Sequence, residues 1–267
     1  MSLKPDVAPV GDEVAIATRA APTARIAVVI PALNEALAIR GVVAAAREQP
    51  YEIIVVEDGS TDGTYEAIAD LGVRVLRHER RMGKGRSLRD GMAEALRLGF
   101  DAVVSMDGDG QHHAVDTPRL IAAHLRDPRA LVLCERSRGR DKQPKMRRLA
   151  NIVADFGVSW GCGQRVLDSQ CGHRLYPRAL LESIPLPTSD GFAFESEMLI
   201  EAARAGFPIA SVTIEARYHE GRRPSHFQPL HDVLRITNML FWKIGKRGFD
   251  LPGLYKSLVS KPLRYEV

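Results

Sequence analysis

The stretch "DAVVSMDGDGQ", residues 101–111, ends an apolar run with two carboxylates that are separated by one glycine. The apolar part is typical of a buried strand. Two like charges held close together repel, and each carboxylate loses solvation when it is buried. A bound cation is the simplest compensation. The segment therefore predicts a strand that carries Asp107 and Asp109 to a ligand site at its carboxyl end.

Strand and helix patterns alternate on both sides of this segment. Strands that are buried on both faces and joined by helices imply a mostly parallel sheet with right-handed crossovers, so the predicted fold class is α/β. The expected strands are 25–31, 51–58, 73–78, 101–107, 130–135 and 207–218, and the expected helices are 36–47, 62–72, 85–99, 116–126, 148–161, 192–206 and 230–248.

The chain is predicted to have three parts. Residues 1–24 mix proline, alanine and scattered charges, which indicates a flexible N-terminal extension. Residues 25–229 contain the alternating pattern and form the main domain. Residues 230–267 are expected to form a C-terminal amphipathic helical segment.

Composition narrows the class of protein. The 267 residues are 45% hydrophobic and 26% charged, which is ordinary globular usage. A net charge of +4 suits anionic ligands, but the basic residues form no dense block, so a nucleic acid is not an expected partner. The three cysteines show no C-x-x-C spacing and indicate reduced thiols in the cytoplasm. No apolar run reaches the ~18 residues of a transmembrane helix.

A second strand also ends in acid. Glu57 and Asp58 close the apolar run at 51–58, and the carboxyl ends of parallel strands share one edge of a sheet. With Gln111 as a third oxygen donor, Asp107 and Asp109 suit Mg²⁺ or Mn²⁺. The alternative for these residues is a polar turn after a strand, because Asp and Gly favour turns.

The neighbouring loops offer further candidates for substrate binding. Asp58 is expected to accept hydrogen bonds from a base or ribose, unless "EDGSTDGT" is only a capped loop. Glu35 either faces the same pocket or begins a helix. The basic loop "RRMGKGRS" (80–87) lacks the spacing of a Walker loop, and its Lys84 is assigned to the substrate.

Six motifs occur in an order that carries a resemblance: "VVIPALNE", "IIVVEDGSTDGT", "GKGRSLRDG", "MDGDGQH", "DSQCGHRLYPRALL" and "FAFESEMLIEAARAG". Over roughly residues 25–245 the chain resembles a family-2 inverting glycosyltransferase of the GT-A fold. The branch that it looks most like is the dolichol- or polyprenyl-phosphate mannosyltransferase group. The resemblance implies a nucleotide-diphosphate sugar as donor and a GT-A fold for the main domain.

The resemblance also implies roles for individual residues. In "CGHR", His173 replaces the aromatic residue of the family's pattern, which affects contacts to acceptor or sugar rather than the fold. Only one of the adjacent Arg147 and Arg148 matches a basic residue of the family, and the sequence does not choose between them. The implied nucleotide residues are Pro31, Glu35 and Asp58; the metal residues are Asp107, Asp109 and Gln111; Arg136 and Asp168 lie near sugar and phosphates; and Arg222, Arg223 and His226 bind a lipid or nucleotide phosphate.

The acceptor decides which catalytic groups are needed. A hydroxyl acceptor requires a general base, for which Glu195 and Glu197 are the candidates. Two residues apart on a helix, they do not share a face, so one of them is expected to enter the site. A lipid phosphate is already anionic and needs positioning by arginines instead. The number of arginines, Arg174 among them, favours a polyprenyl phosphate over a saccharide hydroxyl.

The segment 238–259 mixes aromatic and aliphatic residues with basic ones. It is expected either to lie on the inner face of a membrane or to pack on the domain or on a second copy of the chain.

A phosphatase of the haloacid dehalogenase type is a distant alternative function, because it also uses D-x-D after a strand. Gln111 stands where that class has Thr or Val. A sugar-nucleotide pyrophosphorylase and an inactive binding scaffold are further alternatives.

Overall fold

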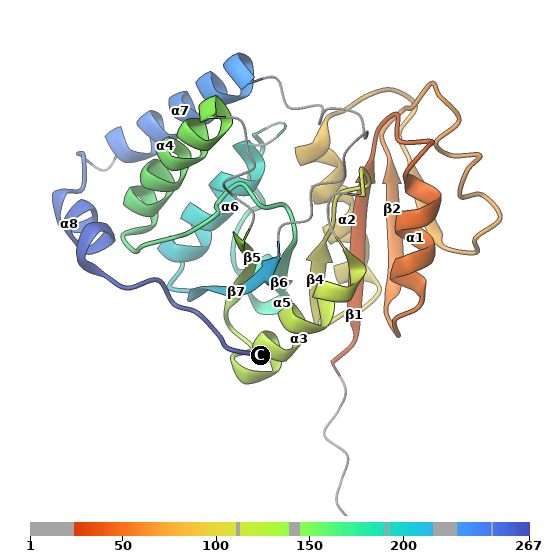
Figure 1. Cartoon of the computed structure of the whole chain (residues 1–267), viewed down its shortest axis with the longest axis horizontal. Coiled ribbons are helices and arrows are strands. Elements are labelled where there is room, and N and C mark those ends of the chain that lie inside the picture. The colour runs from red at the N-terminus through yellow and green to blue at the C-terminus, as the bar shows by residue number, and fades with distance from the viewer. Residues whose placement is uncertain are drawn as a thin grey trace, which may run out of the picture.

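The computed structural model describes residues 24–110, 113–138, 145–189, 191, 193–215, 229–246 and 248–267. Within them lies one seven-stranded sheet of order β3-β2-β1-β4-β6-β5-β7 (Figure 1). All neighbouring strands are parallel except β6, which runs antiparallel to β4 and β5. The strands are β1 (Ile26–Ala32), β2 (Glu52–Glu57), β3 (Arg74–Arg77), β4 (Ala102–Ser105), β5 (Leu131–Arg138), β6 (Arg174–Pro177) and β7 (Ile209–Glu215).

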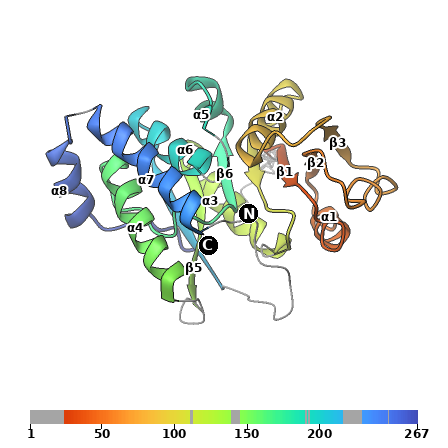
Figure 2. The ribbon, with the colours of Figure 1, turned by 90° about the horizontal axis from the view of Figure 1, so that it is seen from above.

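Helices cover both faces of this sheet (Figure 2). One apolar cluster joins α1 and α3 to the sheet, and the other joins α2 and α4 to α7. The helices are α1 (Ile39–Arg47), α2 (Lys84–Arg97), α3 (Thr117–Arg126), α4 (Lys145–Cys162), α5 (Arg178–Ser183), α6 (Ala193–Arg204), α7 (Pro229–Gly245) and α8 (Leu251–Val259), with a short 3₁₀ helix at Ala114–Asp116.

The apolar run in β1 reflects burial on both faces. Ala27 and Val29 point into one cluster, and Val28 and Ile30 point into the other. Gly91 lets α2 approach this strand closely, because a Cβ there would collide with Val29. The mostly parallel α/β architecture expected from the sequence is confirmed.

The structure differs from the sequence-based prediction at 62–72. Turns replace the expected helix, and the backbone hydrogen bonds there mix three-residue and four-residue spacing instead of forming a continuous helical series. One Asp62 oxygen accepts from the backbone N–H of Thr64 and the other from that of Ala36. The short elements β6 and α5 were not predicted, whereas α8 lies within the expected helical segment 230–267.

The C-terminal segment lies against the main domain. Helix α7 packs on α4 and α6, and α8 packs on α4. Beyond them, Arg264 makes two hydrogen bonds to the buried Glu135, at 2.8 and 2.6 Å. In the described parts of the chain, no helix has both the length and the apolar character needed to cross a bilayer. The boundary at 229/230 stays a prediction, and the N-terminal extension falls outside the described residues.

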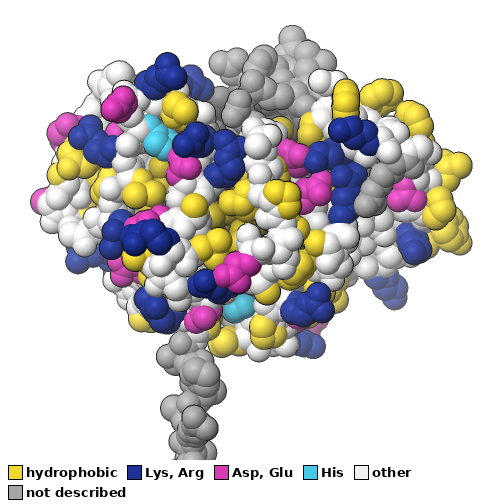
Figure 3. Space-filling model, turned by 180° about the vertical axis from the view of Figure 1, so that it is seen from behind, with side chains coloured by type: hydrophobic (Ala, Val, Ile, Leu, Met, Phe, Trp, Pro, Cys, Tyr) yellow, Lys and Arg dark blue, Asp and Glu magenta, His cyan; other side chains and the backbone are white. Residues whose placement is uncertain are grey.

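Charged side chains of both signs are interspersed on the face seen in Figure 3. Hydrophobic side chains appear among them, with several at the edge of the molecule where α7 and α8 lie.

Candidate active site

The carboxyl ends of β1, β2 and β4 meet at one edge of the sheet. The Met106 N–H donates to Val29 O at 3.0 Å, and the Asp58 N–H donates to Ala32 O at 2.9 Å. A Cβ at Gly108 would lie 3.1 Å from Pro31 O, so the turn after β4 packs directly on the end of β1. The sheet thus brings Pro31, Asp58 and Asp107 to the edge predicted from the sequence.

Three charged side chains from different elements meet beside this edge. Lys84 is the first residue of α2, Asp107 follows β4, and Glu195 lies in the first turn of α6. The Lys84 Nζ lies 2.6 Å from Asp107 Oδ1 and 3.1 Å from Glu195 Oε2. Glu195 is therefore the glutamate of the FESEM segment that enters the site.

The environment keeps Lys84 charged. Burial by itself lowers the pKa of the Lys84 ammonium, but the nearby Asp107 and Glu195 carboxylates outweigh burial and raise it well above its usual value. The first turn of α6 also favours the Glu195 carboxylate, because the amino end of a helix is positive. The cluster is a partly buried ion triad with one ammonium and two carboxylates.

Gly172 lies against both carboxylates. A Cβ there would lie 2.8 Å from Asp107 Oδ2 and 3.0 Å from Glu195 Oε1, so a side chain at this position would collide with both oxygens. Glu195 Oε1 is buried and has no hydrogen-bond partner among the described residues. A buried oxygen of this kind and a carboxylate donor set fit a divalent cation. The described residues contain no complete group of three metal ligands, and Gln111 lies outside them.

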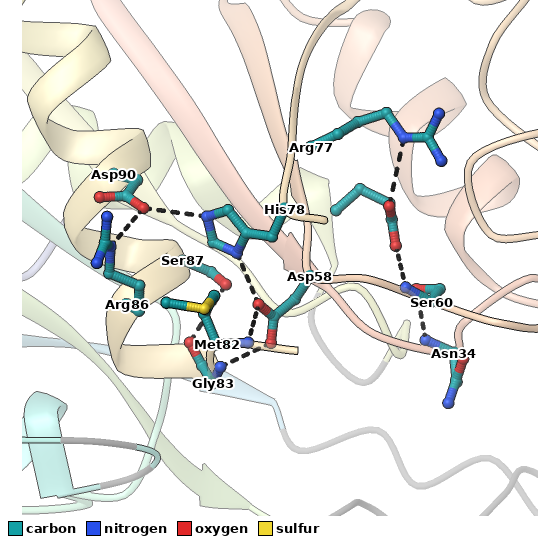
Figure 4. A network of polar contacts seen from close by, with 11 residues as sticks. Asn34, Asp58, Ser60, Arg77, His78, Met82, Gly83, Arg86, Ser87 and Asp90 are labelled. Atoms are coloured by element: carbon teal, nitrogen blue, oxygen red, sulfur yellow. Dashed lines mark hydrogen bonds and ion pairs between the residues drawn. The ribbon is translucent and has the colours of Figure 1, made fainter. Parts of the chain in front are cut away.

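Asp58 has a different environment (Figure 4). Its Oδ1 accepts from the Met82 N–H at 2.8 Å and contacts His78 Nδ1 at 2.7 Å, while Oδ2 accepts from the Gly83 N–H at 2.8 Å. Asp58 is 2% exposed. The sequence predicts that it binds a base or ribose; the structure shows that most of its acceptor capacity already fixes the loop before α2.

Further polar contacts strengthen the same loops in Figure 4. His78 Nε2 lies 3.0 Å from Asp90 Oδ2, and Arg86 Nε donates to that oxygen at 2.7 Å. On the other side, the Asn34 N–H donates to Ser60 Oγ at 3.0 Å. The network joins the ends of β1, β2 and β3 to the start of α2. It therefore sets the position of Lys84.

The segment 168–174 forms another wall of the site. Arg136 holds Asp168 by two side-chain hydrogen bonds of 2.8 and 2.7 Å, so these two predicted residues do meet. Asp155 of α4 accepts from the backbone and hydroxyl of Ser169. Gln170 Nε2 donates to Ser196 Oγ at 3.2 Å, next to Glu195.

Arg174 is not available for a phosphate. It is 0% exposed and donates to the carbonyl oxygens of Cys171, Ser169 and Glu195. Its guanidinium therefore joins the 168–174 segment to the start of α6. The prediction that Arg174 helps to bind a phosphate was therefore wrong, because a motif does not show how deeply a side chain is buried.

Glu197 points away from the triad. Its Oε1 lies 2.5 Å from Lys243 Nζ, which also contacts Glu201 at 2.7 Å. Glu197 therefore joins α6 to α7. The catalytic role predicted for either glutamate stays with Glu195 as a prediction, and the geometry gives Glu197 a structural contact instead.

The structure gives fewer contacts for the remaining predicted residues. Glu35 lies after β1, where its N–H donates to Thr64 Oγ1 at 2.8 Å. Arg148 lies on α4 with an exposed side chain. Five predicted residues, or their side chains, lie outside the part of the chain that the structure describes: Gln111, Arg147, Arg222, Arg223 and His226.

Three contributors were not identified from the sequence. Gly172 was quoted within a motif, but its contact with Asp107, which lies far away in sequence, was not foreseen. Asp155 and His78 carried no local signal, because each acts through contacts between distant segments.

Comparison with known proteins identifies relatives over most of the chain. It is 30% identical over 241 residues to UDP-N-acetylglucosamine--dolichyl-phosphate N-acetylglucosaminyltransferase of Methanococcus voltae, covering 82% of this chain and 96% of that one. It is 29% identical to undecaprenyl-phosphate mannosyltransferase of Micrococcus luteus, covering 71% and 82%.

A similar fold is found in glucosyl-3-phosphoglycerate synthase from Mycobacterium tuberculosis. Its crystal structure with Mn²⁺, uridine diphosphate and glucosyl-3-phosphoglycerate has a TM-score of 0.66 and 29% identity, and the match covers 83% of this chain and 80% of that one. Another structure of that enzyme holds Mg²⁺ and uridine diphosphate.

Residues 27–202 match the family described as Glycosyl transferase family 2. That match removes the phosphatase and pyrophosphorylase alternatives, and the chain belongs to glycosyltransferase family 2.

Proposed function

We propose that this glycosyltransferase moves a sugar from a nucleotide-diphosphate sugar to a polyprenyl phosphate, with inversion at the anomeric carbon. Two relatives are named for a dolichyl or undecaprenyl phosphate acceptor, which supports this acceptor class. The donor class is supported by the uridine diphosphate in the similar crystal structure.

An apolar cavity beside the site carries the proposal for a lipid. A cavity of about 190 Å³ lies between α4 and α7 and is lined mainly by apolar side chains, including Phe156, Trp160 and Phe241. Gln170 also lines it and hydrogen-bonds to Ser196, the neighbour of Glu195. An acceptor with its phosphate at the triad and its first isoprene units in this cavity fits that arrangement.

The residues of the site suit transfer to a phosphate. Asp107 and Asp109, with Gln111, would hold Mg²⁺ or Mn²⁺, and the bound cation would neutralise charge that develops on the leaving diphosphate. Lys84 is placed to contact a phosphate oxygen as a flexible point charge. Arg136, whose guanidinium is positioned by Asp168, would contribute positive charge near the sugar and phosphates.

Peripheral contact with the inner face of a membrane follows from the same proposal. Phe241 and Trp242 of α7 and Tyr255 of α8 are 63%, 58% and 68% exposed. Lys246 lies over the Trp242 ring at 4.2 Å, so a basic group accompanies the exposed aromatic surface. Aromatic and basic side chains together favour an anionic lipid interface. The alternative occupant of this surface is a second copy of the chain.

A binding panel followed by an acceptor screen tests the function. Thermal shifts with UDP-, GDP- and CDP-sugars in Mn²⁺ or Mg²⁺ identify the donor, because a ligand that binds only the folded state raises the melting temperature. The purified protein is then given that donor with short-chain polyprenyl phosphate or free sugars. Product formed only with the lipid phosphate supports the proposal. Donor binding without transfer to any acceptor would instead favour the inactive binding scaffold.

Flotation with liposomes tests the membrane surface. The Phe241→Ser/Trp242→Ser variant is expected to bind anionic liposomes less than the unchanged protein. Leu125→Ser is the matched control, since Leu125 is also exposed but lies on α3. No binding of the unchanged protein to anionic liposomes would contradict peripheral contact.

A hydroxyl acceptor is the second candidate, and the position of Glu195 supports it. A buried carboxylate beside Asp107 is suitably placed to act as a general base. The product bound in the similar crystal structure, glucosyl-3-phosphoglycerate, is not a lipid. Glu195→Gln separates the two candidates. Loss of a general base reduces hydroxyl transfer by about 100- to 10,000-fold, whereas transfer to a phosphate retains more activity.

A further inference from the structure

We propose that Lys84 acts as an internal counter-cation of the metal site. In the donor-free enzyme its ammonium pairs with Asp107 and Glu195 and competes with the divalent cation for these carboxylates. When a donor diphosphate binds, the ammonium pairs with the diphosphate instead. This inference rests on the metal site of the proposed function and adds a residue that controls how tightly that site binds metal. It predicts that metal binds weakly alone and more strongly together with the donor.

The contacts of Lys84 support competition. Its Nζ lies 2.6 Å from Asp107 Oδ1, an oxygen of the first aspartate of the D-x-D motif. The second contact, 3.1 Å to Glu195 Oε2, holds the ammonium between the two carboxylates. The side chains of Lys84, Asp107 and Glu195 are only 18%, 25% and 5% exposed, so water screens their charges weakly.

The charge balance gives competition its direction. One ammonium opposite two carboxylates leaves one negative charge in the triad. A divalent cation that enters beside the ammonium meets a like charge at short range, which opposes its binding. A diphosphate adds negative charge and gives Lys84 a new partner. Metal and donor should therefore each strengthen the binding of the other.

The backbone allows this exchange without a large movement. Lys84 begins α2, and the preceding loop is fixed through the Met82 and Gly83 N–H groups by Asp58 (Figure 4). The four-carbon stem of lysine carries the ammonium on rotatable bonds. The head group can thus change partners while the loop stays in place.

The absence of a side chain at Gly172 lets the second oxygen of each carboxylate lie close to the backbone. Asp107 Oδ2 and Glu195 Oε1 both approach Gly172, whereas Lys84 contacts the other oxygen of each carboxylate. Each carboxylate therefore presents one oxygen to the ammonium and the other toward Gly172. Removing the ammonium should make their full charge available to a metal ion.

Direct measurement of Mn²⁺ binding tests the inference without any transfer reaction. Electron paramagnetic resonance reports free Mn²⁺ during titration of the full chain and of Lys84→Met, which keeps the approximate length of the side chain and removes its charge. Lys84→Met is expected to bind Mn²⁺ about tenfold more tightly in the absence of nucleotide, because a like charge is removed at short range.

Two variants serve as controls. Lys84→Arg retains the charge and is expected to bind Mn²⁺ about as the unchanged chain does. Arg97→Met removes a cation at the last residue of α2, where the side chain contacts Glu94 instead, and is also expected to leave Mn²⁺ affinity unchanged. A similar gain in both methionine variants would overturn the inference, because net charge alone would then explain it.

Adding uridine diphosphate tests the second half of the proposal. The nucleotide is expected to increase Mn²⁺ affinity more in the unchanged chain than in Lys84→Met, so the tenfold difference narrows. Equal Mn²⁺ affinities of the two proteins without nucleotide, or a difference that nucleotide leaves untouched, would overturn this inference alone. Failure of both proteins to bind Mn²⁺ would overturn the proposed metal site and the inference with it.

A measurement on the unchanged chain covers the case in which Lys84→Met does not fold. The lysine ammonium signals are recorded by proton–nitrogen NMR, and the Lys84 signal is assigned by its absence from Lys84→Arg. Saturating Mg²⁺ is expected to shift this signal, while K⁺ at equal ionic strength is not. An unchanged Lys84 signal at saturating Mg²⁺ would contradict the competition.

Discussion

The ends of β2 and β4 look alike in sequence but are used differently in the structure. Asp58, at the end of β2, binds two backbone N–H groups and a histidine of one loop. Asp107, after β4, pairs with the Lys84 side chain and lies close to Gly172. A carboxylate fixed by backbone donors stabilises the fold. One that is paired with a flexible ammonium can change partner when a ligand arrives.

The largest effect is expected at the end of β4. Asp109→Ala should reduce sugar transfer by at least about 100-fold, because the loss of a metal ligand removes several kcal/mol of transition-state stabilisation. Transfer is measured with radiolabelled donor, and the melting temperature checks folding. Asp70→Ala, which removes an exposed acid that pairs with Arg40, serves as the control and should retain transfer. Full activity of Asp109→Ala in buffer with metal would contradict the metal site.

The second-largest expected effect is a difference in stability between variants at the ends of β2 and β4. Asp58→Asn should lower the free energy of unfolding by about 2–3 kcal/mol, since an amide NH₂ would face backbone donors. Asp107→Asn should change it by about 1 kcal/mol or less and reduce transfer instead. Urea denaturation and transfer assays measure both properties. The distinction between the strand ends fails if Asp107→Asn is the more destabilised protein.

A glycine pair tests the loop that Asp58 holds. Gly59 and Gly63 both have positive φ, +72° and +88°, so alanine is strained at either position. At Gly59 a Cβ would also lie 2.5 Å from the carbonyl carbon of Arg80, whereas at Gly63 the nearest atom is 3.9 Å away. Gly59→Ala should therefore cost about 1–2 kcal/mol more than Gly63→Ala, measured by urea denaturation. Equal costs would show that the loop yields freely.

The smallest effect is expected at Glu197. Glu197→Gln weakens an ion pair with Lys243, which keeps its contact with Glu201, so the stability loss should be about 1 kcal/mol or less. Transfer should stay near that of the unchanged chain. A loss of transfer equal to that of Glu195→Gln would place Glu197 in the site and contradict the observed orientation.

The sequence predicted the sheet edge well because local patterns determine it. Apolar runs of strand length, separated by helical repeats, require parallel strands whose carboxyl ends share an edge. The positions of Asp58 and Asp107 at that edge follow from this rule alone. The expected helix at 62–72 is instead a series of turns with hydrogen bonds of mixed spacing. Asp62 also bonds to Ala36 on another loop, a contact that no local pattern contains.

The partners of each carboxylate could not be predicted in the same way. Glu195 and Glu197 have similar sequence surroundings, yet one meets Lys84 and the other meets Lys243. The choice depends on where α6 lies relative to α2 and α7. Likewise, the count of arginines did not distinguish the buried Arg174 from those that can reach a phosphate.

By itself, the sequence determined the α/β fold, the acidic sheet edge and the family resemblance, because each depends on residue types at fixed local spacing. Only the tertiary structure decided that Asp58 fixes a loop, that Glu195 joins Asp107 and Lys84, and that Gly172 lies against both carboxylates. These contacts join residues far apart in the chain through the antiparallel insertion of β6 between β4 and β5 and the packing of α2 and α6. Burial and long-range packing set them, and neither is written in the spacing of a motif.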